Sequence, residues 1–187
     1  MDRLVQVIMV GERIRDAREN KGISVRKLAA MVEVSASLIS QIETGKVDPS
    51  LSTLRKIAIA LDVALFSLVL TNGSAPTRVI RNRERRLVLF PKAGLSYDII
   101  HSDPNKKMGV MIGTLSPKGA TSETMLNHPG EECLVVLGGA MTVELADEVI
   151  ELQEGDSLYF DSTIPHLLRN DAKRPCRFYL IITPPKF

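Results

Sequence analysis

The sequence predicts an α+β protein of two domains, an all-α domain followed by an all-β domain. The composition changes near residue 73: one proline and one aromatic residue, Pro49 and Phe66, precede it, and the other nine prolines and seven aromatic residues follow it. Apolar residues recur at helical spacing in the first part and form short strand-like runs in the second. The segment 71–77 has the Gly, Ser and Pro content of a linker. We therefore expect domains at 1–72 and 85–187, joined by a linker at 73–84.

Five helices are expected in the first domain. The first carries its apolar stripe over residues 7–17 and stops at 20–22, and Ser24 and Ser35 can cap the second and third. Gly45 ends the third helix, and Pro49-Ser50 opens a fourth that runs to Leu61. A short fifth helix is expected near 65–70.

Seven short strands are expected in the second domain. They cover residues 86–90, 95–101, 107–115, 132–137, 140–145, 148–152 and 177–183. Gly138-Gly139 and Ala146-Asp147 are hairpin signals between neighbouring runs. Many short strands in so few residues favour a β-sandwich or a small barrel.

Several protein classes are excluded by composition. The formal net charge of +2 indicates neither a polybasic tail nor a highly acidic chain. Two cysteines, Cys133 and Cys176, are too few for a disulfide scaffold and fit a reducing compartment. The longest apolar stretch, 57–70, has 14 residues and includes Asp62, fewer than the roughly 20 that span a bilayer. We expect a cytoplasmic protein with no membrane partner.

The third predicted helix has the composition of a DNA-reading helix. It follows a tight turn at Glu33-Val34, and its outward face consists of small or amide side chains: Ala36, Ser37, Ser40 and Gln41. A helix of that width enters the major groove, where Gln can read adenine. Cations at Arg26, Lys27 and Lys46 could neutralise phosphates. The alternative is a helical module for protein association, in which Ser24 and Ser35 only cap helices.

Residues 8–70 resemble the XRE-type helix-turn-helix family, the domains of the lambda and 434 repressors. The resemblance rests on Leu28-Ala29, on Ser35-x-Ser37-x-Ile39-Ser40-x-Ile42-Glu43-x-Gly45 and on Pro49-Ser50-Leu51-x-Thr53-Leu54. It implies a five-helix fold with base contacts from Ala36, Ser37, Ser40 and Gln41, and phosphate contacts from Ser24, Arg26, Ser35 and Lys46. Many members place Gln where this sequence has Val25, so one contact is missing.

Two imidazoles and a carboxylate stand out in the second domain. His128 and Glu132, four residues apart, would face the same side of an extended chain, and His166 on another strand could meet them inside a barrel. This ligand set suits a non-haem iron, manganese or zinc ion with open coordination positions.

Residues 85–185 resemble the cupin superfamily, whose fold is a double-stranded β-helix or jelly roll. The first cupin motif falls on Gly119, His128, Glu132 and Gly139, and the second on Gly155, His166 and Asn170. This chain departs from the pattern at Leu126, which replaces the first His, and at Asp161 and Thr163. The resemblance then implies His128, Glu132 and His166 as ligands of a divalent metal (Zn, Fe, Mn or Ni). Alternatively, the same side chains bind a small-molecule effector, or an empty barrel serves only in dimerisation.

The domain order resembles the XRE–cupin family of bacterial transcriptional regulators. The resemblance implies a homodimer that binds double-stranded DNA and responds to a small-molecule effector or a metal, with no enzymatic activity. The alternative is a metal-dependent cupin enzyme, a dioxygenase or isomerase, with an attached DNA-binding domain. Leu126 disfavours the enzyme, because catalytic cupins usually retain more metal ligands.

Overall fold

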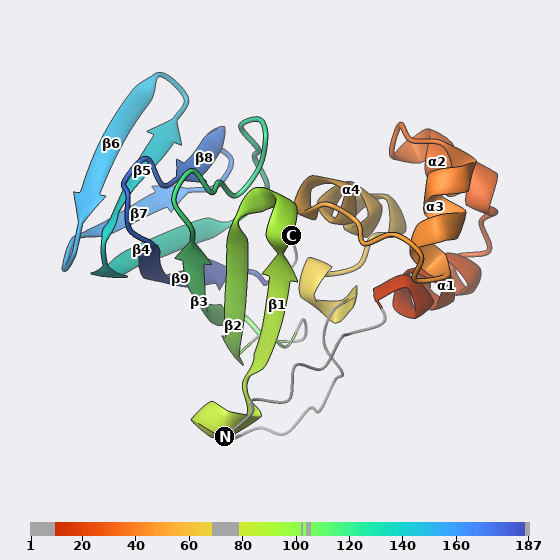
Figure 1. Cartoon of the computed structure of the whole chain (residues 1–187). Coiled ribbons are helices and arrows are strands. Elements are labelled where there is room, and N and C mark those ends of the chain that lie inside the picture. Colours follow the sequence, from red (N-terminus) through yellow and green to blue (C-terminus); the bar gives the residue numbers. More distant parts are fainter. Residues whose placement is uncertain (1–9, 69–78, 102, 104–105, 186–187) are drawn as a thin grey trace. The chain divides into compact units, whose positions relative to one another are not determined.

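A computed structural model describes residues 10–68, 79–101, 103 and 106–185, which form two compact units, one helical and one built of strands (Figure 1). The predicted boundaries at 72–73 and the first part of the linker fall on residues 69–78, outside the described chain. The domain bounds 1–72, 73–84 and 85–187 therefore stay predictions.

The helical unit contains four α-helices in its described residues. They are α1 (Val10–Asn20), α2 (Val25–Met31), α3 (Ala36–Glu43) and α4 (Leu51–Leu61). The short fifth helix expected near 65–70 is found at Leu65–Leu68 as a 3-10 helix, η1, and residues 69–70 lie outside the described chain. Asp62, in the left-handed conformation at φ 56°, ends α4.

Three serine hydroxyls begin α2, α3 and α4. Ser24, Ser35 and Ser50 each accept a hydrogen bond at 3.1 Å from the backbone N–H three residues ahead. The caps expected at Ser24 and Ser35 and the helix start expected at Pro49-Ser50 are therefore confirmed. The apolar stripes of the four helices meet in a buried core that includes Ile14, Leu28, Ile39, Leu54 and Ile57.

The strand unit contains two antiparallel sheets. The six-stranded sheet has the order β1-β2-β3-β9-β4-β7 and the three-stranded sheet the order β6-β5-β8 (Figure 1). Two 3-10 turns, η2 (Asn82–Glu84) and η3 (Pro91–Ala93), flank β1. The strands are β1 (Arg86–Phe90), β2 (Leu95–His101), β3 (Gly109–Leu115), β4 (Glu131–Gly138), β5 (Ala140–Leu145), β6 (Glu148–Gln153), β7 (Ser157–Asp161), β8 (His166–Arg169) and β9 (Cys176–Thr183). All seven expected strands are present, and β7 and β8 are additional.

The two predicted hairpins have different outcomes. Ala146-Asp147 joins β5 to β6 as a two-residue hairpin, with Leu145 paired to Glu148. Gly138-Gly139 does not form a hairpin, because β4 and β5 belong to different sheets. Gly139 has φ 82°, and a Cβ there would lie 2.5 Å from the carbonyl oxygen of Pro175, so a glycine is needed where the chain crosses between sheets.

Alternation along β4 separates an inner from an outer face of the large sheet. Glu132, Leu134 and Val136 are buried, whereas Glu131 is exposed and Cys133 half-buried. Glu132 is therefore a carboxylate on the core side of the sheet. No helix in the described part of the chain is both long and apolar enough to cross a membrane.

Candidate functional site

The outward face of α3 carries the side chains expected to read bases. Ser37, Ser40 and Gln41 are exposed and Ala36 is half-buried, whereas Ile39 and Ile42 lie in the core. The Gln41 amide Nε2 donates a long hydrogen bond of 3.5 Å to Ser37 Oγ, one turn earlier. This face presents amide and hydroxyl groups and no large apolar side chain, as contact with base edges requires.

The predicted phosphate contacts are also exposed. Ser24 and Ser35 stand at the N-termini of α2 and α3, where unpaired backbone N–H groups and the helix dipole favour an anion. Arg26 lies in the first turn of α2, and Lys46 follows α3. Their exposure is compatible with the predicted role.

A buried ion pair that sequence reasoning missed holds α3 against α1. Arg18 donates from Nε and an Nη to the two carboxylate oxygens of Glu43, at 2.6 and 2.9 Å. At the same crossing a Cβ on Gly11 would lie 2.0 Å from the carbonyl oxygen of Ile42, so only glycine permits this approach. No motif or residue spacing indicates the Arg18–Glu43 contact or the Gly11–Ile42 contact, because the partners are far apart in sequence.

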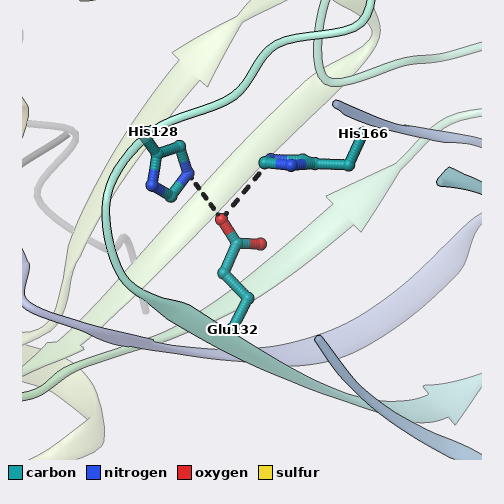
Figure 2. Close-up of side chains that lie close together, drawn as sticks. All are labelled: His128, Glu132 and His166. Carbon is teal, nitrogen blue, oxygen red and sulfur yellow. Dashed lines mark hydrogen bonds and ion pairs between the residues drawn. The ribbon is translucent and has the colours of Figure 1, made fainter. Parts of the chain in front are cut away.

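In the strand unit His128, Glu132 and His166 come together (Figure 2). The Oε1 atom of Glu132 lies 2.8 Å from His128 Nε2 and 3.6 Å from His166 Nε2. The three residues are 9%, 3% and 3% exposed, respectively. The convergence predicted from the sequence is confirmed, although His128 lies in the loop before β4 and not on an extended strand.

Backbone carbonyls orient both imidazoles. His166 Nδ1 lies 2.9 Å from the carbonyl oxygen of Ile164, and His128 Nδ1 lies 3.4 Å from that of Pro129. Without a metal ion, His128 Nε2–H donates to Glu132 Oε1 at 2.8 Å. A bound cation would take the place of that proton, and the tautomer with the proton on Nδ1 would offer the Nε2 lone pair as a ligand. The backbone N–H of His128 donates to the carbonyl oxygen of Ser162 at 2.9 Å, which fixes the loop beside β7.

Leu126 stands where the cupin motif has its first His. Its backbone exchanges two hydrogen bonds with His166, at 3.0 and 2.8 Å, in an isolated antiparallel bridge. Residues paired in this way project to the same side, so Leu126 places an apolar side chain beside the imidazole. Phe160 is also close, with its ring centroid 5.1 Å from that of His166.

Asn170, the last residue of the second motif, has a structural role. Its side chain is fully buried and bonds the carbonyl oxygens of Leu115 and Arg174 and the N–H of Ala172. It thereby fixes the chain just after β8, the strand that begins with His166. Sequence reasoning did not find Ser162, which is fully buried and whose Oγ has no hydrogen-bond partner among the described residues.

The donor set of the three residues fits a divalent metal ion. Two neutral imidazole nitrogens and one carboxylate oxygen are ligands that zinc, iron, manganese and nickel accept, and three ligands leave coordination positions open. The hydrogen bonds on the two Nδ1 atoms are those that orient metal-binding histidines.

Comparisons with known proteins match both units. The helix-turn-helix family model matches residues 14–68, and the cupin domain model matches residues 111–182. The HTH-type transcriptional regulator PuuR of Escherichia coli is 29% identical over 180 residues, covering 95% of this chain and 96% of that protein.

Two solved structures extend the comparison. An HTH_3 family transcriptional regulator from Vibrio cholerae has a TM-score of 0.71 at 22% identity, covering 94% of both chains. Hydroxypropylphosphonic acid epoxidase from S. wedmorenis has a TM-score of 0.50 at 17% identity, covering 96% of this chain and 98% of the epoxidase, and at that identity it shares the fold alone. This chain joins a helix-turn-helix domain to a cupin domain and aligns along nearly its whole length with an HTH-type transcriptional regulator. These matches identify it as an XRE–cupin DNA-binding transcriptional regulator.

Proposed function

We propose that this regulator reads a specific operator with α3 and senses a small molecule or a divalent metal in its cupin domain. The observation that supports DNA reading is the exposed face of α3. It carries the polar side chains of Ser37, Ser40 and Gln41 and no large apolar side chain. Ala36 completes the base-reading set, and Ser24, Arg26, Ser35 and Lys46 supply phosphate contacts. A protein with this activity works on chromosomal DNA in the cytoplasm.

The regulator acts as a homodimer on a pseudo-palindromic operator. A single helix-turn-helix module buries limited DNA surface, and two modules related by a two-fold axis bind half-sites about one helical turn apart. The affinity for the operator then comes from the contacts of both modules together, each of which binds its half-site only weakly.

The sensing site consists of His128, Glu132 and His166. A bound Zn, Fe, Mn or Ni ion would supply a Lewis-acidic centre to which a small oxygen-containing effector can bind. Leu126 offers that effector an apolar wall beside the open positions. Regulation requires that the effector or metal bind the DNA-competent state and the DNA-incompetent state with different affinities.

A metal-dependent cupin enzyme is the second candidate, and the favouring observation is the His–Glu–His cluster with open positions. Leu126 argues against it, because an apolar side chain at the fourth position supplies neither a ligand nor a proton-transfer group. We therefore propose that the chain is not an enzyme.

Selection of genomic fragments by the purified full chain tests the function, followed by fluorescence anisotropy on the selected site. Each titration is run with metal-free protein and with Zn²⁺, Mn²⁺, Fe²⁺ or Ni²⁺ added. We expect enrichment of a two-fold symmetric site, and a metal-dependent shift in affinity that His166→Ala abolishes. Asn127→Ala, an exposed neighbour of the site, is the matched control and should respond as the wild type does. Absence of any sequence preference would refute operator reading, and an identical response in His166→Ala would refute the sensing site.

A further inference from the structure

The Ser162 hydroxyl is a buried polar group that makes no hydrogen bond within the described part of the chain. Ser162 is fully buried, and its Oγ atom has no partner there. Both of its backbone groups are paired: its N–H donates to the carbonyl oxygen of Gly130 at 2.8 Å, and its carbonyl oxygen accepts from the N–H of His128 at 2.9 Å. A buried hydroxyl without a hydrogen bond costs free energy, which points to a partner that is not part of the chain.

The pairing of β4 with β7 places this hydroxyl on the same face of the sheet as Glu132. Glu132 is paired with Phe160, and Glu131 with Asp161. Side chains alternate along a strand, and the alternation continues past the end of β7, since Phe160 is buried, Asp161 exposed and Ser162 buried. Ser162 is therefore the diagonal neighbour of Glu132 on the inner face. Diagonal neighbours are roughly 7–8 Å apart, a separation that one small molecule can bridge.

The same segment contacts the other two members of the cluster. The carbonyl group of Ser162 holds the loop that carries His128. The ring of Phe160 lies against that of His166, with 5.1 Å between the ring centroids. Residues 160–162 therefore border the His–Glu–His cluster on one side, and Ser162 is the residue of this segment that brings a polar side chain to the inner face.

The charge and the lining of the cluster favour a small carboxylic acid as the ligand. Two neutral imidazoles and one carboxylate around a divalent ion leave one net positive charge, which attracts an anion. Leu126, paired with His166, and Phe160 are apolar and suit the hydrocarbon part of such a molecule. The oxygens of a carboxylate accept hydrogen bonds, and a hydroxyl is a suitable donor to them.

We propose that the Ser162 hydroxyl donates a hydrogen bond to a carboxylate oxygen of the effector, a small carboxylic acid that binds at the cluster of His128, Glu132 and His166. The inference rests on the proposed sensing function. It adds a fourth side chain to that site and assigns its effector to a chemical class. Because the hydroxyl contacts the effector and not the metal, its removal leaves the affinity for the metal unchanged.

Ser162→Ala in the full chain tests this role. Each protein is loaded with Co²⁺, a spectroscopic substitute for Zn²⁺, and titrated with acetate while the visible absorption of the ion is followed. We expect Ser162→Ala to bind acetate at least about fivefold more weakly than the wild type, with a Co²⁺ affinity within about twofold of the wild-type value. Without metal, its melting temperature should equal or exceed that of the wild type, because no hydrogen bond within the protein is lost.

Thr142→Val is the matched control, because Thr142 is also buried but its hydroxyl donates to Asp171 at 2.9 Å. This variant should lower the melting temperature of the metal-free protein and leave acetate binding unchanged. Acetamide has the shape of acetate without its charge, and the wild type should bind it at least about tenfold more weakly than acetate.

Two results would overturn the role of Ser162. One is an acetate affinity in Ser162→Ala equal to that of the wild type. The other is a melting temperature lowered as in Thr142→Val, because the hydroxyl would then be a structural group. A wild type that binds Co²⁺ but not acetate would refute the carboxylic acid and leave the metal site standing. A wild type that does not bind Co²⁺ would refute the proposed metal site as well.

Discussion

Arg18 on α1 binds the carboxylate of Glu43 on α3 through two hydrogen bonds, although the two residues lie in helices separated by α2. The pair is buried, with side-chain exposures of 10% and 4%. Arg18 also donates to the carbonyl oxygen of Ile23 at 3.0 Å, and Arg15 donates to that of Glu43 at 3.3 Å. The Glu43 carboxylate, near the C-terminal end of α3, thus holds the proposed DNA-reading helix in position against α1.

Glu43→Ala should reduce the free energy of unfolding of the helical unit by about 3–5 kcal/mol, because it leaves the Arg18 guanidinium buried without its counter-ion. Urea denaturation followed by far-ultraviolet circular dichroism measures the change. The control is Glu33→Ala, which removes an exposed ion pair with Lys56. The side chains of Glu33 and Lys56 are 80% and 54% exposed, so the change in stability should be less than about 1 kcal/mol. Equal effects of the two variants would show that the Arg18–Glu43 pair does not fix α3.

Gln41→Ala should weaken binding to the selected operator by roughly 1–3 kcal/mol and leave binding to unrelated DNA nearly unchanged. The side chain is exposed on α3, so its removal disturbs no core contact. Fluorescence anisotropy on both DNAs at one salt concentration measures the ratio of affinities. An equal loss on both would assign Gln41 to the phosphate backbone instead of the bases.

Lys46→Ala should weaken binding to every DNA sequence and reduce the slope of log affinity against log salt by about 1, because one phosphate contact and its released counter-ion are lost. Lys46 is exposed directly after α3. Titrations at several salt concentrations give the slope, and Lys92→Ala, an exposed lysine of the strand unit, serves as the control. A slope equal to that of the wild type would remove Lys46 from the contact set.

Local signals predicted much of the fold because their physical causes are local. The serines that cap α2 and α3 and the strand runs around Leu134 and Leu180 depend on neighbouring residues alone. By contrast, the crossing of the chain from one sheet to the other at Gly138-Gly139 depends on a residue distant in sequence, because Gly139 packs against the carbonyl oxygen of Pro175. The 3-10 geometry of Leu65–Leu68 was also not predictable, because the apolar spacing of four residues does not distinguish a 3-10 helix from one turn of α-helix.

The cupin motif predicted the meeting of His128, Glu132 and His166, because the fold fixes those positions. It could not show how the imidazoles are oriented, because the acceptors are carbonyl groups that any residue supplies. The Arg18–Glu43 pair was equally inaccessible, since many arginines and glutamates are available and only the packing of α1 on α3 selects these two.

The two cysteines should differ in reactivity toward thiol reagents. Burial raises the pKa of Cys176 to about 11, so at neutral pH it is a protonated thiol without access to solvent. Cys133 is half-buried on the outer face of β4. In the native protein, labelling with a maleimide should modify Cys133 first, with Cys133→Ser as the control and mass spectrometry as the readout. Preferential modification of Cys176 would contradict the burial of β9.

Leu126→His should strengthen binding of a divalent metal, because it adds a fourth ligand beside His166. The paired backbones of Leu126 and His166 place both side chains on the same side of the bridge, next to Glu132. Leu126 is half-buried, so the imidazole replaces it without a large loss of core contacts.

Calorimetric titration of metal-free protein with Zn²⁺ or Ni²⁺ should show at least about a tenfold gain in affinity for Leu126→His, equivalent to about 1.4 kcal/mol. Met125→His is the matched control, because the adjacent residue projects to the other side of an extended chain and is 37% exposed. An unchanged affinity in Leu126→His, or the same gain in Met125→His, would mean that the metal does not bind between His128, Glu132 and His166. A gain in affinity in Leu126→His alone would support the proposal that Leu126 leaves one coordination position of the metal for the effector to occupy.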